Sequence, residues 1–162
     1  MRIEPVLYDL AQAVNDKLRD AGATLVTAES CTGGLIAGAI TAVPGSSDIL
    51  YGGFVTYSNA AKTAMIGVPE DLIAHYGAVS PEVARAMAEG ARRTAQSDFA
   101  IAVTGVAGPS GGSVDKPVGL VHFGLASATG TVHVERRFGD IGRDQVRAET
   151  VATALQMILD AL

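Results

Sequence analysis

The chain has few of the residues on which disulfides and metal sites depend. Its 162 residues include one cysteine, three histidines and no tryptophan. A single cysteine excludes an internal disulfide and fits a reducing compartment, so we expect a cytoplasmic protein. The histidines, His75, His122 and His133, do not stand at ligand spacing from one another or from Cys31. The sequence therefore predicts no metal site.

Positive charge and long apolar runs are also scarce. The formal net charge is -5, and lysine and arginine nowhere form a run. Binding to nucleic acid or to an anionic membrane surface is therefore not expected. No apolar stretch is long enough to span a bilayer. The first five residues, MRIEP, lack the apolar core of a signal peptide.

Aliphatic side chains and glycine are abundant. Hydrophobic residues make up 48% of the chain and charged residues 18%, which is typical of a globular protein. The length suits one domain with a full core, which we expect to cover residues 1–162. Many of the 19 glycines fall in two clusters, Gly33-Gly34 and residues 105–112. Because glycine lets a ligand approach the backbone, both clusters are candidate binding loops.

The order of apolar patterns predicts alternating helices and strands. Expected helices cover residues 5–20, 32–43, 59–66, 69–76 and 81–95, with a last helix beginning near residue 142. Expected strands cover residues 25–28, 49–57 and 99–103, followed by a hairpin of residues 118–126 and 131–138. This order is typical of an α/β fold, in which helices enclose a mostly parallel sheet. The C-terminal hairpin is expected to add antiparallel pairing.

Polar residues follow each of the first three expected strands. They occupy residues 29–32, 57–62 and 104–112. Right-handed crossovers make such strands parallel, so their C-terminal ends share one edge of the sheet. Ligands of open α/β sheets bind outside that edge. We therefore expect these three segments to form one site.

Ser30 is the candidate nucleophile of this site. A serine hydroxyl needs a base to take its proton, and no histidine lies near these strand ends. Lys62 is the candidate base if burial or a positive neighbour lowers its pKa, and Tyr57 is a candidate proton relay. Backbone N–H groups at Thr32-Gly33 or Thr104-Gly105 are candidates for stabilising an oxyanion. The chemistry would be acyl transfer through an acyl-enzyme, followed by hydrolysis.

Each of these residues also has an ordinary structural interpretation. Serine is a preferred helix N-cap, so Ser30 is a candidate cap for the helix that follows it. Lys62 is a candidate surface lysine, and Tyr57 a candidate core residue with a hydrated hydroxyl. Cys31 is an alternative nucleophile because thiols at helix N-termini have lowered pKa values. We rank it below Ser30 because it too lacks a histidine nearby.

Three cations are candidates for binding an anionic group. Lys116 follows the glycine-rich loop at residues 105–112, which lacks the Gly-Lys-Ser/Thr ending of a Walker loop. Arg143 begins the last helix, where its charge opposes the helix dipole, and Arg147 lies one turn further on. A bound anion would relieve that opposition. The alternative is that both arginines are solvated, as most arginines are.

Five segments together resemble the C-terminal domain of the competence/damage-inducible CinA family. They stand in the family's order, and the resemblance extends over nearly the whole chain from about residue 5. The segments are TAESCTGG at 27–34, YSNAAK at 57–62, GAVSPE at 77–82, TGVAGP at 104–109 and KPVG at 116–119. The family fold implies a three-layer α/β/α sandwich with a mixed sheet. Stand-alone members of this family are nicotinamide-nucleotide amidases.

The resemblance implies hydrolysis of nicotinamide mononucleotide, a pyridine mononucleotide, to nicotinic acid mononucleotide and ammonia. It implies Ser30 as nucleophile, Lys62 as its base and Tyr57 as an assisting group, with no metal or organic cofactor. The expected substrate-binding residues are Thr32, Gly33, Gly34, Thr104, Gly105, Ala107, Gly108, Lys116 and Arg143.

Two departures from the family pattern and several alternatives remain. Ala60-Ala61 stand where the family often has an acidic residue. Ile141-Gly142 separate Gly139-Asp140 from Arg143, whereas the family usually has arginine directly after this Gly-Asp pair, so Arg147 stays an alternative ligand for the substrate phosphate. A non-catalytic nucleotide-binding module and a serine amidase for another small amide are the alternative functions. A homo-oligomer is compatible with the small residues on the helix faces.

Overall fold

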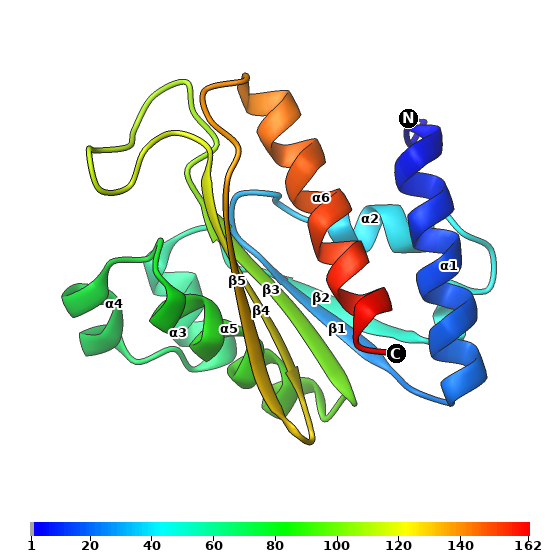
Figure 1. Cartoon of the computed structure of the whole chain (residues 1–162). Coiled ribbons are helices and arrows are strands. Elements are labelled where there is room, and N and C mark those ends of the chain that lie inside the picture. The colour runs from blue at the N-terminus through cyan, green and yellow to red at the C-terminus, as the bar shows by residue number, and fades with distance from the viewer. Residues whose placement is uncertain (1) are drawn as a thin grey trace.

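The structure, a computed structural model, describes residues 2–162, which form a five-stranded sheet with helices on both faces (Figure 1). The strands are β1 (Leu25–Glu29), β2 (Leu50–Val55), β3 (Phe99–Gly105), β4 (Leu120–Ser127) and β5 (Gly130–Arg137). Their order in the sheet is β2-β1-β3-β4-β5. β1 pairs in parallel with β2 and with β3. β4 pairs antiparallel with β3 and with β5. The expected α/β sandwich with a mixed sheet and a C-terminal hairpin is confirmed.

Within residues 2–162, three α-helices lie on each side of the sheet (Figure 1). One layer contains α1 (Pro5–Ala21), α2 (Leu35–Thr41) and α6 (Arg143–Asp160). The other contains α3 (Asn59–Ile66), α4 (Glu70–Tyr76) and α5 (Pro81–Ala95). A short 3-10 helix, η1 (Ser46–Asp48), precedes β2. The two helix layers and the sheet between them form the expected three-layer sandwich.

Two cores lie on the two faces of the sheet, and β3 contributes to both. Ile101 and Val103 pack into the core under α1, α2 and α6, whereas Ala100 and Ala102 pack into the core under α5. This division follows from the two-residue period of a strand. The small side chains on the α5 face let that helix approach closely. A Cβ added at Gly124 of β4 would stand 2.6 Å from the carbonyl oxygen of Ala84.

The second helix is shorter than its apolar pattern predicts. The expected helix over residues 32–43 is observed only from Leu35 to Thr41. Gly33 and Gly34 adopt positive φ angles of 59° and 107°, which the right-handed helix excludes. Residues 30–34 therefore form a turn between β1 and α2. This turn carries Ser30 at the edge of the sheet.

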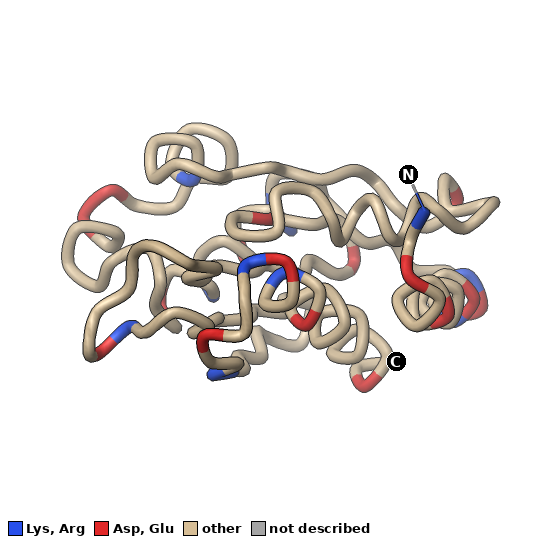
Figure 2. Tube along the Cα trace, turned by 90° about the horizontal axis from the view of Figure 1, so that it is seen from above, with Lys and Arg blue, Asp and Glu red and all other residues tan. Residues whose placement is uncertain are grey.

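The surface of the chain carries mixed charge. Figure 2 shows Lys and Arg positions interspersed with Asp and Glu positions along the trace. Across residues 2–162 the structure contains no helix that is both long enough and apolar enough to cross a membrane.

Candidate active site

A cavity of about 210 Å³ opens at the C-terminal edge of the parallel strands. The register pairs Glu29 with Val55 of β2 and with Val103 of β3, so the three strands end side by side. The chain segments that follow them converge there, as their order in the sequence predicted. The cavity is lined by Ser30, Cys31, Tyr57, Asn59, Lys62, Ala78, Val79, Thr104, Gly105, Ala107 and Arg143.

Ser30 and Lys62 meet in this cavity although 32 positions separate them in the sequence. The Lys62 Nζ lies 3.1 Å from the Ser30 Oγ. Nζ also donates to the carbonyl oxygens of Thr56, at 3.0 Å, and Tyr57, at 3.3 Å. Lys62 is 1% exposed, and no carboxylate within residues 2–162 forms an ion pair with it. The interpretation of Lys62 as a solvated surface lysine is therefore wrong.

The surroundings of Lys62 favour the neutral amine. Burial lowers the pKa of Lys62 below its ordinary value of 10.5, because the charged form loses solvation. A neutral amine has two N–H groups, which match the carbonyl oxygens of Thr56 and Tyr57, and a lone pair that can face Ser30. In the protonated state the third N–H faces Ser30, whose hydroxyl can donate to the Tyr57 carbonyl at 3.5 Å. The pair can thus exchange one proton without rearranging its neighbours.

A buried carboxylate, rather than Ser30, caps the helix that follows the turn. Glu29 is 1% exposed. It accepts hydrogen bonds from the Thr32 hydroxyl at 2.6 Å, the Ile36 N–H at 2.8 Å and the Ala37 N–H at 3.0 Å. Its negative charge lies at the positive end of the α2 dipole. The cap interpretation of Ser30 is therefore wrong, and its hydroxyl is left available for Lys62.

The turn residues that were expected to bind substrate do not line the cavity. Thr32 is fully buried and its hydroxyl is bound to Glu29. Gly33 and Gly34 supply the positive φ angles of the turn, and none of these three residues lines the cavity. Glu29 belongs to the first expected site segment, residues 29–32, but no role was predicted for it. An acidic residue just before an expected helix was the available signal.

The third segment lines the opposite wall of the cavity. The Thr104 hydroxyl donates to the Ala78 carbonyl at 2.8 Å and so fixes the loop before α5. Gly105 and Ala107 also line the cavity, as expected. Gly108 does not. Ala78, with Val79 and Asn59, was not singled out from the sequence, because small apolar side chains and a lone amide carry no distinctive chemical signal.

Tyr57 and Arg143 meet at the mouth of the cavity. The Tyr57 side chain is 61% exposed, and its hydroxyl accepts a hydrogen bond from Arg143 Nη2 at 3.2 Å. Arg143 Nη1 donates to the Gly108 carbonyl at 2.9 Å. The backbone carbonyl of Tyr57, and not its phenol, contacts Ser30 and Lys62. The structure thus gives the phenol a different partner from the one expected of a proton relay.

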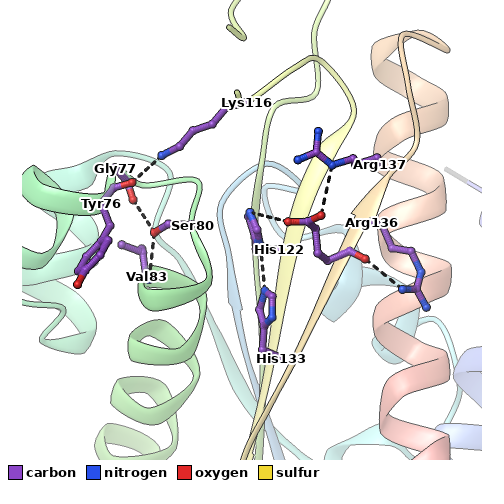
Figure 3. Close-up of polar contacts among 10 residues, drawn as sticks. Tyr76, Gly77, Ser80, Val83, Lys116, His122, His133, Arg136 and Arg137 are labelled. Atoms are coloured by element: carbon purple, nitrogen blue, oxygen red, sulfur yellow. Dashed lines mark hydrogen bonds and ion pairs between the residues drawn. The ribbon is translucent and has the colours of Figure 1, made fainter. Parts of the chain in front are cut away.

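Lys116 lies outside the cavity. Its Nζ donates to the Tyr76 carbonyl at the end of α4, as Figure 3 shows, at a distance of 2.6 Å. The same view shows a second polar cluster on the hairpin, where His122 Nδ1 and His133 Nε2 are 2.9 Å apart. No group of three or more metal-ligating side chains that could hold an ion occurs among residues 2–162.

Cys31 lines the cavity but is poorly suited to act as the nucleophile. Its thiol is 5% exposed. Burial raises the pKa of Cys31 to about 12, and the nearby Glu29 carboxylate acts in the same direction. The thiol is therefore protonated near neutral pH, whereas nucleophilic attack requires the thiolate. The geometry favours Ser30 over Cys31.

Comparison with known proteins identifies the family. The family model of the CinA C-terminal domain matches residues 7–162. This chain belongs to the CinA C-terminal domain family. This CinA domain is 48% identical over 152 residues to nicotinamide-nucleotide amidohydrolase PncC of Escherichia coli strain K12, covering 94% of this chain and 92% of that protein. It is 53% identical over 150 residues to a CinA-like protein of Synechococcus sp. strain RCC307, covering 92% of this chain but only 36% of that relative.

Solved structures of CinA proteins share the fold closely. The crystal structure of the competence/damage inducible protein CihA from Agrobacterium tumefaciens has a TM-score of 0.96 at 48% identity, with 99% of this chain and 98% of that chain covered. The CinA superfamily protein ECK1530/EC0983 from Escherichia coli has a TM-score of 0.92 at 33% identity, with 100% and 95% covered. The CinA domain described here thus spans nearly all of these proteins, and little more than a third of the longer CinA-like relative.

Proposed function

We propose that this CinA domain is an amidase that hydrolyses the carboxamide of nicotinamide mononucleotide to nicotinic acid mononucleotide and ammonia. The observation that carries the proposal is the 3.1 Å contact between the Ser30 hydroxyl and a buried lysine amine with a lowered pKa. A nucleophile beside its base is the arrangement that acyl transfer requires. The 48% identity to a protein named nicotinamide-nucleotide amidohydrolase supports this substrate class.

The proposed reaction uses Ser30 and Lys62 in two half-reactions. Ser30 Oγ attacks the carboxamide carbon while Lys62 Nζ takes the hydroxyl proton. The tetrahedral intermediate collapses when Lys62 returns that proton to the leaving nitrogen, which releases ammonia and leaves an ester on Ser30. Water then attacks the ester, with Lys62 accepting its proton and delivering it to Ser30 Oγ. No metal or organic cofactor has a part in these steps.

The oxyanion of each intermediate needs backbone donors near Ser30. The Gly33 N–H, one of the expected donors, already donates to the Ser30 carbonyl at 3.1 Å. We therefore assign the role to the N–H groups of Cys31 and Gly105, both of which line the cavity. The residue after a nucleophile commonly supplies such a donor.

We assign the substrate phosphate to Arg143. Its guanidinium lines the cavity, where the Gly108 carbonyl and the Tyr57 hydroxyl hold it in place. No carboxylate among residues 2–162 forms an ion pair with Arg143, so its charge is available to a ligand. A guanidinium can form two hydrogen bonds with phosphate. Tyr57 then acts at the cavity mouth, by positioning Arg143 rather than by relaying a proton.

The test is ammonia release from nicotinamide mononucleotide by the wild type, Ser30→Ala and a control, Ser58→Ala. Ser58 follows the same strand edge, but its hydroxyl accepts only from the Ala61 N–H as the cap of α3. Ser30→Ala is expected to abolish turnover and Ser58→Ala to keep it. Full activity in Ser30→Ala would refute the nucleophile assignment. Equal turnover of nicotinamide riboside, which lacks the 5′-phosphate, would instead favour an amidase for another small amide.

A further inference from the structure

Arg147 contacts the turn that carries Ser30 through two backbone carbonyl groups. Its Nε donates to the Cys31 carbonyl at 3.2 Å, and its Nη2 donates to the Thr32 carbonyl at 3.3 Å. Arg147 lies on α6, more than 110 positions away in the sequence. It does not line the cavity, although Arg143, one helical turn earlier, does.

We propose that Arg147 is a positioning residue, which holds the turn at residues 30–34 so that the Ser30 hydroxyl stays within reach of Lys62. The inference rests on the proposed role of Ser30 as the nucleophile. It replaces the expectation that Arg147 is an alternative ligand for the substrate phosphate.

Two backbone hydrogen bonds tie the turn locally: the Ser30 N–H donates to the Val103 carbonyl and the Gly33 N–H to the Ser30 carbonyl, both at 3.1 Å. Gly33 and Gly34 have no side chains, and both adopt left-handed backbone conformations. The one neighbour within 4 Å of a Cβ added at Gly33 is Arg147 Nη2, at 3.7 Å. A displacement of about 1 Å at a reacting group can lower the rate roughly 100-fold. Holding this turn is therefore a condition for catalysis.

Glu29 and Arg147, two opposite charges, bind adjacent parts of the segment that runs from the turn into α2. Glu29 accepts the Thr32 hydroxyl and two N–H groups of α2. Arg147 donates to the carbonyl oxygens of Cys31 and Thr32. Thr32 is thus bound at its hydroxyl by the anion and at its carbonyl by the cation. Arg147 thus restrains the peptide groups that follow Cys31 and Thr32, while Glu29 restrains the start of α2.

The position of Arg147 in α6 is unfavourable for the helix alone. Arg143 and Arg147 are like charges four residues apart, in the first turns of a helix whose N-terminus is already positive. Their acceptors are carbonyl groups on different segments of the site: Gly108 for one, Cys31 and Thr32 for the other. This cost is explained if each arginine has its own task, Arg143 toward the substrate and Arg147 toward the nucleophile turn.

The experiment compares Arg147→Met with Arg143→Met, two identical changes one helical turn apart. Steady-state turnover of nicotinamide mononucleotide gives kcat and KM. The rate at which a fluorophosphonate labels Ser30 reports the nucleophile without any substrate. We expect Arg147→Met to lower kcat and the labelling rate by about 10- to 100-fold, with KM within about twofold of the wild type. Arg143→Met should raise KM and leave labelling near the wild-type rate.

Rescue and fold controls complete the design. Arg147→Lys should recover part of the labelling rate, because an ammonium can still reach one of the two carbonyl oxygens. If circular dichroism shows that Arg147→Met is unfolded, Arg147→Lys serves as the test variant. The proposal then requires that Arg147→Lys lower kcat and the labelling rate without raising KM.

Two results would overturn the proposal. Wild-type labelling and kcat in folded Arg147 variants would show that the turn does not need this residue. A raised KM with normal labelling would make Arg147 a substrate ligand. If Ser30 is not labelled even in the wild type, the nucleophile assignment itself is refuted. If Ser30 is labelled normally in Arg147→Met, only the role of Arg147 is refuted.

Discussion

Two pairs of side chains in hydrogen-bond contact lie on the two halves of the sheet, and they differ in what surrounds them. Ser30 and Lys62 lie where the parallel strands end, beside a cavity. His122 and His133 are cross-strand neighbours in the antiparallel hairpin, with stacked rings and a ring-nitrogen contact of 2.9 Å. Burial lowers the pKa of Lys62 and of both histidines. A lowered pKa is therefore not what distinguishes the candidate active site.

The difference is access. Neither histidine lines the cavity, whereas the groups at the parallel edge face a space that a ligand can enter. Strand ends and helix starts leave backbone N–H groups and short loops at that edge, which a hairpin interior does not. The comparison predicts chemistry at the Ser30 pair and only a structural contribution from the histidine pair. The following predictions test this contrast.

The largest expected effect is on turnover. Lys62→Met should lower kcat by about 10²–10⁴-fold, because the base that takes the Ser30 proton is lost. His133→Asn should keep kcat close to the wild type, because its ring contacts His122 and does not line the cavity. Ammonia release measures both variants. Comparable losses in the two variants would contradict the contrast between the halves.

The next effect concerns the buried carboxylate at the parallel edge. Glu29→Gln should lower the free energy of unfolding by about 1–3 kcal/mol, because the capping N–H groups of α2 lose a charged acceptor. Activity should fall with it, since the same turn carries Ser30. Glu70→Gln, in the first turn of α4 and exposed, is the matched control and should change stability by less than about 0.5 kcal/mol. Urea unfolding measures both, and equal shifts would count against a special role for Glu29.

The pH dependence of activity tests the state of Lys62. Because the proposed base is the neutral amine, kcat/KM should rise with pH and level off above an apparent pKa that lies below 10.5. The unfolded chain holds the Lys62 proton more tightly than the folded one, so this residue also makes folding more favourable as pH rises through that window. Rate profiles from pH 6 to 10 measure the first effect. If the residual activity of Lys62→Met showed the same rise of kcat/KM with pH, Lys62 would not be the group that titrates, and its proposed role as the base would be refuted.

The smallest effect is expected at the histidine pair. The pKa of each histidine is lowered, by burial first and then by neighbouring charge: His133 beside His122 and Arg85 beside His133. Glu82 and Glu135 oppose these shifts, and Lys116 adds to the one at His122.

The folded state therefore binds fewer protons than the unfolded state just below the ordinary value of 6.5. Stability should fall as pH falls through this window. His133→Asn should weaken that dependence in thermal unfolding scans between pH 5 and 7. An unchanged slope would show that the pair does not titrate on unfolding.

Some parts of this protein could be read from local signals. Pro5 and Gly22 delimit α1, and Ser80 with Pro81 begins α5, because these residues have strong positional preferences in helices. The alternation of helix and strand patterns predicted a sheet whose parallel edge gathers three polar segments. The helix expected from residue 32 begins only at Leu35, because the positive φ angles of Gly33 and Gly34 extend the turn at the strand end.

The direction of side chains could not be read in this way. The sequence placed Tyr57 near Ser30 and Lys62, but it could not show that the carbonyl would face them and the phenol would face Arg143. The choice between Arg143 and Arg147 likewise depended on how α6 is rotated against the sheet. Each of these contacts joins segments far apart in the chain.

The sequence by itself determined the α/β architecture, the segments at the sheet edge and the reactive groups available there, because periodicity and turn chemistry are local properties. Only the tertiary structure decided which groups touch: the Lys62 amine with the Ser30 hydroxyl, Arg143 with the cavity, and Arg147 with the turn at residues 30–34. The physical reason is that helix packing fixes side-chain direction to within ångströms, whereas a sequence pattern fixes only which face a residue occupies.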